Sequence, residues 1–94
     1  MINFNGNIVD ESNQLSNNRG FLFGDAVFET LRVISNYIPF WEDHYFRLMA
    51  SMRVLRFNIP DSFTPEFLKN EILKLHSKSN LGLNSRIRIT VYRN

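Results

Sequence analysis

The chain has 94 residues, the length of a single domain, and eleven Lys and Arg against nine Asp and Glu give a formal net charge of +2. So balanced a charge excludes long-range attraction as the basis for binding nucleic acid or a membrane surface. The chain has no cysteine, which excludes disulfides and thiolate metal sites. Nine Phe, three Tyr and one Trp need a core or a partner surface to cover them.

The sequence contains no apolar run of about 18 residues, the length that a membrane-spanning helix requires. Its start, MINFNGNIVDE, lacks the basic residues and the apolar run of a signal peptide. We therefore expect a cytoplasmic protein with neither a membrane nor a nucleic-acid partner.

The first elements in chain order are two short strands, expected at Ile2–Phe4 and Asn7–Val9. The pair Asn5-Gly6 between them suits a two-residue type I′ hairpin turn. The polar stretch DESNQLSNNRG, which follows from Asp10, is typical of a loop.

A longer strand is predicted from about Asp25 to Ile34. Alternation places its side chains on two faces, each mostly apolar and each with one charge. One face has Val27, Glu29, Leu31 and Val33, and the other has Ala26, Phe28, Thr30, Arg32 and Ile34. Glu29 and Arg32 either lie at the rim of the sheet, which the pattern favours slightly, or the strand passes a ligand site lined by Phe28, Thr30 and Arg32.

After a turn at Ser35-Asn36, the stretch YIPFW is expected to return as a strand. Pro39 has no N–H to donate, so this strand would be short or lie on an edge. The chain ends in SRIRITVYRN, a strand of period two with Ile87, Ile89 and Val91 on one face.

Between these strands two helices are predicted. The first begins at Trp41 and has an apolar stripe of Trp41, Tyr45, Leu48, Met52 and Leu55, with Arg53 and Arg56 in its last turn. The second is capped by Thr64 with Pro65 at its first position, and its pattern turns Lys69, Lys74 and Lys78 to solvent. The order ββββααβ predicts an α+β fold, with both helices packed on one face of a largely antiparallel sheet.

The first helix has a polar ridge of His44, Arg47 and Ser51 beside its apolar stripe. A guanidinium that starts from a half-buried position at Arg47 would suit a phosphate or carboxylate. The spacing alone favours the alternative, in which Arg47 extends to solvent or pairs with a local acid.

Other basic and histidine residues have a plain explanation. Arg86, Arg88 and Arg93 suit a charged, exposed sheet edge, although with Arg32 and Arg47 they supply several anion-seeking groups around one sheet. His76, near a helix C-terminus, is expected on the surface. His44 and His76 lie far apart without acidic residues at ligand spacing, so no metal site is expected.

Three segments together, RGFLFGDAVFETLRV, FWEDHYFRL and RIRITVYR, resemble the N-terminal domain of the fold-type IV enzymes that use pyridoxal phosphate. That family includes branched-chain and D-amino acid aminotransferases and aminodeoxychorismate lyases. The resemblance covers nearly the whole chain. Ala26 and Asn94 depart from it, since many relatives have Gly at these places.

The resemblance implies roles for individual residues. Arg47 is similar to the arginine that binds the cofactor phosphate, and His44 would support it. Phe28, Arg32 and Arg93 fall where the family contacts its substrate, an amino acid or amino-carboxylate that reacts through a Schiff base. Thr30, which follows the Glu of FETLRV, slightly favours the lyase-like or broad aminotransferase members of the family over the branched-chain type.

In this family the Schiff-base lysine lies in a second, larger domain, and no lysine here matches it. We therefore expect residues 1–94 to be the small N-terminal domain of a two-domain enzyme, inactive alone and homodimeric when full length. The competing hypothesis is a stand-alone module that binds anions or proteins without catalysis.

Overall fold

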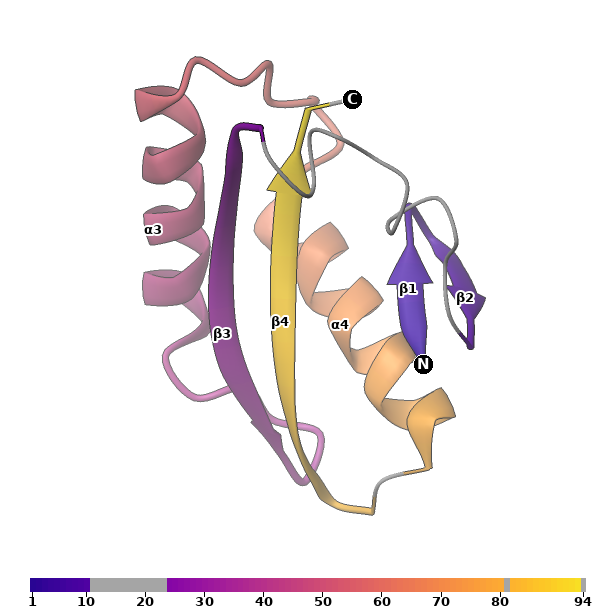
Figure 1. Cartoon of the computed structure of the whole chain (residues 1–94). Helices are drawn as coiled ribbons and strands as arrows, with labels where there is room; N and C mark the ends of the chain where they lie inside the picture. The colour runs from indigo at the N-terminus through magenta and orange to yellow at the C-terminus, as the bar shows by residue number, and fades with distance from the viewer. Residues whose placement is uncertain (11–23, 81, 94) are drawn as a thin grey trace.

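The computed structural model describes residues 1–10, 24–80 and 82–93. Its elements follow in the order β1 (Ile2–Phe4), β2 (Asn7–Val9), β3 (Ala26–Ile34), α3 (Trp41–Val54), α4 (Pro65–Ser79) and β4 (Asn84–Tyr92). The fold is therefore α+β, as the sequence predicts (Figure 1). Apart from Asp10, the predicted loop over residues 10–20 lies outside the described residues.

Strands β1 and β2 form the predicted hairpin, with Ile2 opposite Val9 and Phe4 opposite Asn7. Both turn residues have positive φ, 53° at Asn5 and 93° at Gly6, as a type I′ turn requires. The side-chain amide of Asn3 donates to the carbonyl oxygen of Glu71 at 3.2 Å, which attaches the hairpin to α4.

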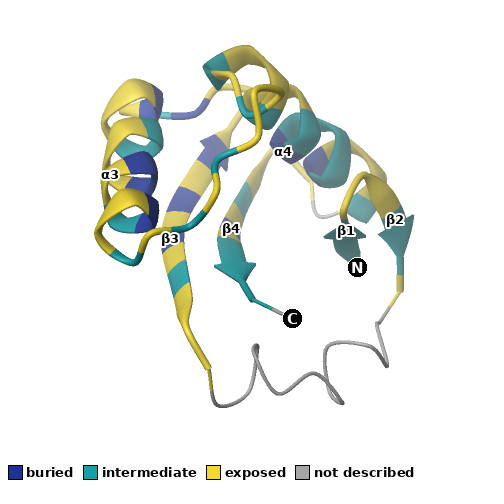
Figure 2. Ribbon diagram, turned by 90° about the horizontal axis from the view of Figure 1, so that it is seen from above, coloured by how far each residue is buried: buried dark blue, intermediate teal, exposed yellow. Residues whose placement is uncertain are grey.

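Strands β3 and β4 pair antiparallel along their whole length, from Ala26 opposite Tyr92 to Ile34 opposite Asn84. One face of this ribbon is buried by Leu31 and Val33 of β3 and Ile87 of β4, which pack with Trp41 of α3 and Ile72 of α4. Both helices thus pack on the same face of the ribbon, and Figure 2 shows the buried positions of α3 turned toward β3.

Two details of the predicted sheet are wrong. The β1–β2 hairpin and the β3–β4 ribbon are separate two-stranded sheets among the described residues, not one sheet. The predicted strand over YIPFW is reduced to a single bridge between Ile34 and Tyr37. It stops there because Pro39 has no N–H for a ladder and Phe40, at φ 58°, turns the chain into α3.

Helix α3 begins at Trp41 as predicted but ends at Val54, earlier than expected. Arg56 lies beyond it with a φ of 58°, so it is not in the last turn. The buried side chains Leu48, Met49 and Met52 of α3 form a second cluster, against which Val27, Ile89 and Val91 of the ribbon pack. Within the described residues, no helix is long and apolar enough to cross a membrane.

Helix α4 begins as the sequence predicts, with Thr64 as its N-cap and Pro65 as its first residue. The Thr64 hydroxyl oxygen accepts a hydrogen bond from the backbone N–H of Phe67 at 3.1 Å. This bond satisfies one of the N–H groups that have no partner inside the helix.

Replacing Thr64 with Ala should lower the free energy of unfolding by about 1 kcal/mol, because the cap of α4 is lost. Urea denaturation followed by circular dichroism measures the change. The exposed Ser62 lies two residues earlier, outside the helix, and Ser62→Ala is the matched control. An equal effect of both substitutions would contradict the capping role.

Candidate functional site: a buried carboxylate that holds an arginine

Glu29 lies on the helix-facing side of β3, between the apolar neighbours Val27 and Leu31. Only 8% of the residue is exposed. The favoured interpretation of Glu29 as a rim residue is therefore wrong. A buried carboxylate needs charged or hydrogen-bonding partners, since an isolated one would be strongly destabilising.

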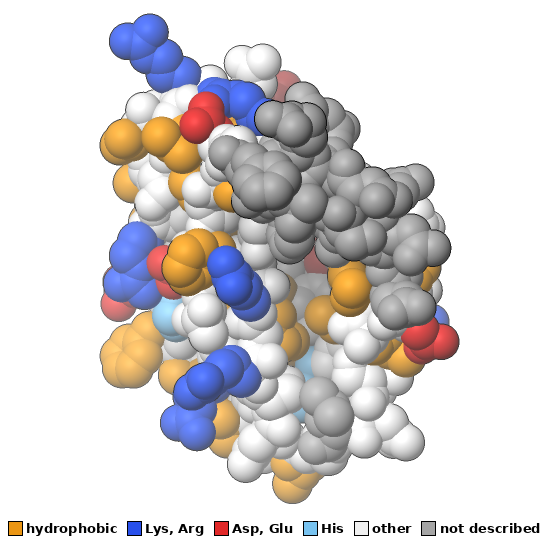
Figure 3. Space-filling view, viewed as in Figure 1, with side chains coloured by type: hydrophobic (Ala, Val, Ile, Leu, Met, Phe, Trp, Pro, Cys, Tyr) orange, Lys and Arg blue, Asp and Glu red, His pale blue; other side chains and the backbone are white. Residues whose placement is uncertain are grey.

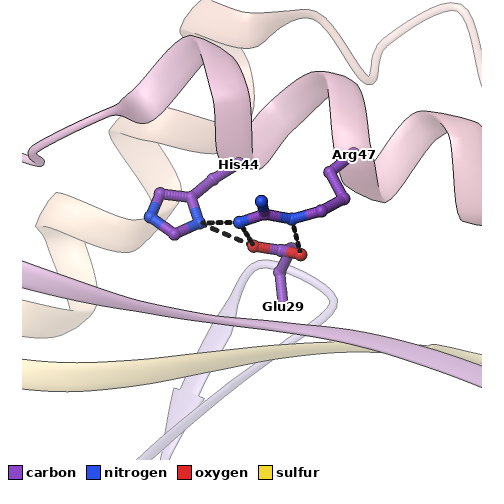
Figure 4. A network of polar contacts seen from close by, with 3 residues as sticks. All are labelled: Glu29, His44 and Arg47. Carbon is purple, nitrogen blue, oxygen red and sulfur yellow. Dashed lines mark hydrogen bonds and ion pairs between the residues drawn. The ribbon is translucent and has the colours of Figure 1, made fainter.

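Arg47 on α3 supplies the first partner (Figure 4). Its Nε–H donates to Glu29 Oε1 at 2.7 Å, and its Nη2–H donates to Glu29 Oε2 at 3.0 Å. Two parallel bonds from one guanidinium to one carboxylate form a bidentate pair, the geometry that arginine provides and lysine does not. The sequence alternative in which Arg47 pairs with a local acid is thus present in the structure.

His44, one turn before Arg47, supplies the second partner. Its Nδ1 lies 2.6 Å from Glu29 Oε2 and 3.2 Å from Arg47 Nη2. A carboxylate oxygen only accepts and an arginine nitrogen only donates, so the shorter contact assigns a proton to Nδ1. His44 therefore donates to Glu29, and its approach to Arg47 is a contact between two donors.

Glu29, His44 and Arg47 form the Glu29 cluster, and its electrostatics follow from these contacts. The hydrogen bond from Arg47 lowers the pKa of Glu29, against the desolvation that raises it, and the His44 contact lowers it further. The same bond raises the pKa of Arg47 above its usual value. Glu29 is thus a carboxylate at neutral pH, and Arg47 is a cation.

Arg47 itself is open to solvent, with 60% of its side chain exposed. This corrects the expected half-buried position. Glu29 occupies Nε and Nη2, whereas the Nη1 group has no hydrogen-bond partner among the described residues (Figure 4). The buried carboxylate therefore fixes one edge of the guanidinium and leaves N–H donors of the other edge available to an anion. Ser51, the third residue of the predicted ridge, is not part of the cluster.

Phe28 and Arg32 lie on the opposite face of β3 from Glu29, and both are exposed. Phe28 is 58% exposed, and the guanidinium of Arg88 lies 4.2 Å from the centre of its ring. The predicted cofactor residues His44 and Arg47, on α3, thus lie against the inner face of β3, whereas the predicted substrate residues Phe28 and Arg32 are on its outer face. Phe28 and Glu29 are consecutive residues of β3, so a single strand carries residues of both proposed groups on its opposite faces.

Arg93, just past the end of β4, lies beside the start of β3. Its side chain forms an ion pair with Asp25 and donates to the carbonyl oxygen of Leu55. Its guanidinium also lies 4.3 Å from the ring centre of Phe57. These contacts hold Arg93 at the end of the ribbon, away from the Glu29 cluster on α3.

His76 is buried, with 8% exposed, so its predicted surface position is wrong. Its Nδ1 lies 2.6 Å from the hydroxyl oxygen of Ser85 on β4. This contact joins α4 to the ribbon and explains how a polar side chain is accommodated there. The described residues hold no group of three His, Asp or Glu that could bind a metal ion.

Glu29 is the residue whose role the sequence pattern missed. The available signal was a lone acid in phase with Leu31 and Val33 on a strand, followed by His44 and Arg47 one turn apart on the next helix. A buried charge on one element predicts an opposite charge on the element packed against it.

Comparison with protein families gives a match to amino-transferase class IV over residues 26–94. Because the match covers most of the chain, this protein belongs to the class IV aminotransferase family. The resemblance seen in the sequence is thus confirmed. The aminotransferases of this family in general depend on pyridoxal phosphate and act on amino acids. Comparison with curated protein sequences gives no significant match.

Replacing Glu29 with Gln should lower the free energy of unfolding at pH 7 by about 1–3 kcal/mol, since the charged bonds to Arg47 and His44 are lost. The pKa of Glu29 is lowered by folding. Its stabilising effect is therefore full above the unfolded pKa of about 4.3, and is lost as the pH falls through the lower folded value.

Urea titrations of the wild-type protein and Glu29→Gln at several pH values measure this difference, which should shrink below about pH 4. Glu42→Gln is the matched control, because Glu42 is an exposed acid on α3 with no ion pair among the described residues. A difference between wild type and Glu29→Gln that is the same at all pH values would contradict the ionised pair.

Proposed function

We propose that this chain is the cofactor-phosphate-binding small domain of a pyridoxal-phosphate-dependent class IV aminotransferase or aminodeoxychorismate lyase-like enzyme. The observation that carries the proposal is the bidentate Glu29–Arg47 pair, at 2.7 and 3.0 Å, which leaves Nη1 of an exposed guanidinium unpaired among the described residues. Such an edge suits two oxygens of a phosphate group.

The donor set fits a phosphate monoester. Arg47 would hold the phosphate, Glu29 would keep the guanidinium oriented, and His44 would hold the Glu29 carboxylate in place from its Nδ1–H. A prealigned guanidinium loses less side-chain entropy on binding than a free one. When bound, pyridoxal phosphate supplies the Schiff-base chemistry toward the substrate amine.

The substrate would be an amino acid or amino-carboxylate. Phe28 offers an exposed aromatic surface and Arg32 an exposed cation on the outer face of β3, and both are suited to the apolar and carboxylate parts of such a molecule. Arg93 would act from the end of β4, where Asp25 and Leu55 now hold it.

All three lysines of the chain, Lys69, Lys74 and Lys78, lie on α4. Lys74 is engaged with Glu71 at 2.9 Å and with the carbonyl oxygen of Gly6 at 3.0 Å. The Glu29 cluster lies instead between α3 and β3. We propose that a second domain supplies the reactive lysine, and that the complete enzyme is a cytoplasmic homodimer.

Replacing Arg47 with Ala in the full-length protein should weaken binding of pyridoxal phosphate about 10- to 150-fold, the effect of losing charged hydrogen bonds. Binding of pyridoxal, which lacks the phosphate, should change little. Fluorescence titration with both ligands gives the ratio of the two affinities, which a general folding defect would not alter selectively.

The matched control for Arg47→Ala is Arg53→Ala, because Arg53 is an exposed arginine on the same helix with no ion pair among the described residues. Arg47→Lys should restore only part of the affinity for pyridoxal phosphate, since lysine keeps the positive charge but lacks the two parallel N–H donors of a guanidinium. An unchanged ratio of the two affinities in Arg47→Ala would refute the phosphate assignment.

Residues 1–94 alone, with added pyridoxal phosphate, should show no transamination, because no lysine lies in the Glu29 cluster to anchor the cofactor and move protons. An assay that follows oxo-acid formation from several amino acids measures this. Turnover that depends on added pyridoxal phosphate would contradict the two-domain proposal.

A further inference from the structure

The edge of β4 that faces away from β3 borders a hollow of about 560 Å³. Every residue of β4 from Ser85 to Val91 lines this hollow, whichever face of the ribbon its side chain is on. Because neighbouring side chains of a strand point to opposite faces, such an unbroken run means that the backbone edge itself borders the hollow. Among the described residues, no strand pairs with this edge.

The backbone groups on this edge follow from the hydrogen bonds of the ribbon. The N–H of Arg93 donates to the carbonyl oxygen of Asp25 at 3.3 Å, and this pair continues the β3–β4 register. In an antiparallel pair, residues that bond to the partner strand alternate with residues whose N–H and C=O point away from it. The odd-numbered residues of β4 therefore bond to β3. The N–H and C=O groups that point toward the hollow include those of Arg86, Arg88 and Thr90.

The side chains around the hollow are mainly apolar. Helix α4 contributes Leu68, Ile72 and Leu75, and the partly exposed hydrophobic residues Met1 and Phe67 also line it. Figure 3 shows hydrophobic side chains in the space between β4 and α4. An occupant of the hollow therefore needs apolar side chains toward α4 and backbone-like hydrogen-bonding groups toward β4.

A β-strand meets both requirements at once, since it pairs through its backbone and presents every second side chain to one face. A small apolar molecule would cover the floor but leave the N–H and C=O groups of β4 without partners, and water would do the reverse. The arginines of β4 do not protect this edge by their charge. Their side chains alternate with the buried Ile87 and stand on the outer face of the ribbon.

We propose that one further β-strand, from the part of the full-length protein that follows Asn94, docks in this hollow and pairs antiparallel with β4. The inference rests on the proposed function, in which the protein has a further domain. An antiparallel neighbour can follow β4 through a turn of only two residues. The ribbon of a second copy does not fit, because its β4 carries β3 along the other edge, whereas here Ile2 and Asn3 of β1 line the hollow as well.

The test is amide hydrogen exchange in the ¹⁵N-labelled full-length protein without added cofactor, followed by NMR. The edge amides are those of Arg86, Arg88 and Thr90. The control amides are those of Ile87 and Ile89, which bond to β3. The edge amides should exchange at rates within about tenfold of the control amides, because both sets are held in a sheet. Edge amides that exchange more than about tenfold faster than the control amides would overturn the proposal.

Nuclear Overhauser effects from the edge amides identify the strand that pairs with them. Contacts to residues after Asn94, with protection that does not change on dilution, support the proposal. Contacts to residues within 1–94, or protection that is lost on dilution because a second copy supplies the strand, would overturn it.

Leu75→Asp places a charge on the floor of the hollow, where an apolar strand would cover it. The edge amides should then exchange at least about tenfold faster, while the control amides change little. Ser77→Asp is the matched control, because Ser77 is exposed on the same helix and does not line the hollow. Equal effects of the two substitutions would contradict docking against α4. Because no cofactor is present, failure of the phosphate site at Arg47 would leave this exchange pattern unchanged.

Discussion

The buried carboxylate of Glu29 is the constraint on which the candidate site depends. A charge on the helix-facing side of β3 is tolerated only when partners satisfy it, and both of its partners, His44 and Arg47, come from α3. The pair therefore fixes which turn of α3 lies against β3, together with the apolar contacts of Leu48 and its neighbours. The same bonds set the orientation of the guanidinium, so the packing of α3 on β3 and the orientation of Arg47 have one physical cause.

Because side chains alternate along a strand, the two faces of β3 have different surroundings. Its inner face contributes Leu31 and Val33 to the core and Glu29 to the polar cluster, whereas its outer face presents Phe28 and Arg32 to solvent. A proposed phosphate site beside α3 and a proposed substrate surface on the outer face therefore share one strand. Strand β3 pairs with β4 along all nine of its residues, so both surfaces belong to one continuous ribbon.

Local signals in the sequence were sufficient for most elements. Asn5-Gly6 predicted the first hairpin, Thr64-Pro65 the start of α4, and the period of two the inward face of β4. These local signals do not predict which strands pair when they are far apart in the sequence. Whether YIPFW returns as a strand depends on Pro39 and on the turn at Phe40, and whether two hairpins merge into one sheet depends on the tertiary packing. The partners of Glu29 and His76 also lie on other elements, on α3 and β4. A sequence pattern can show that a polar side chain falls on a buried face, but not which residue of another element pairs with it.

Glu29 holds one edge of the Arg47 guanidinium, and we propose that the other edge binds the cofactor phosphate. A crystal structure of the full-length protein with pyridoxal phosphate tests it most directly. We expect a phosphate oxygen within hydrogen-bonding distance of Arg47 Nη1, with Nε and Nη2 still bonded to Glu29. A phosphate bound away from Arg47, or an Arg47 side chain that leaves Glu29 to reach it, would contradict the account.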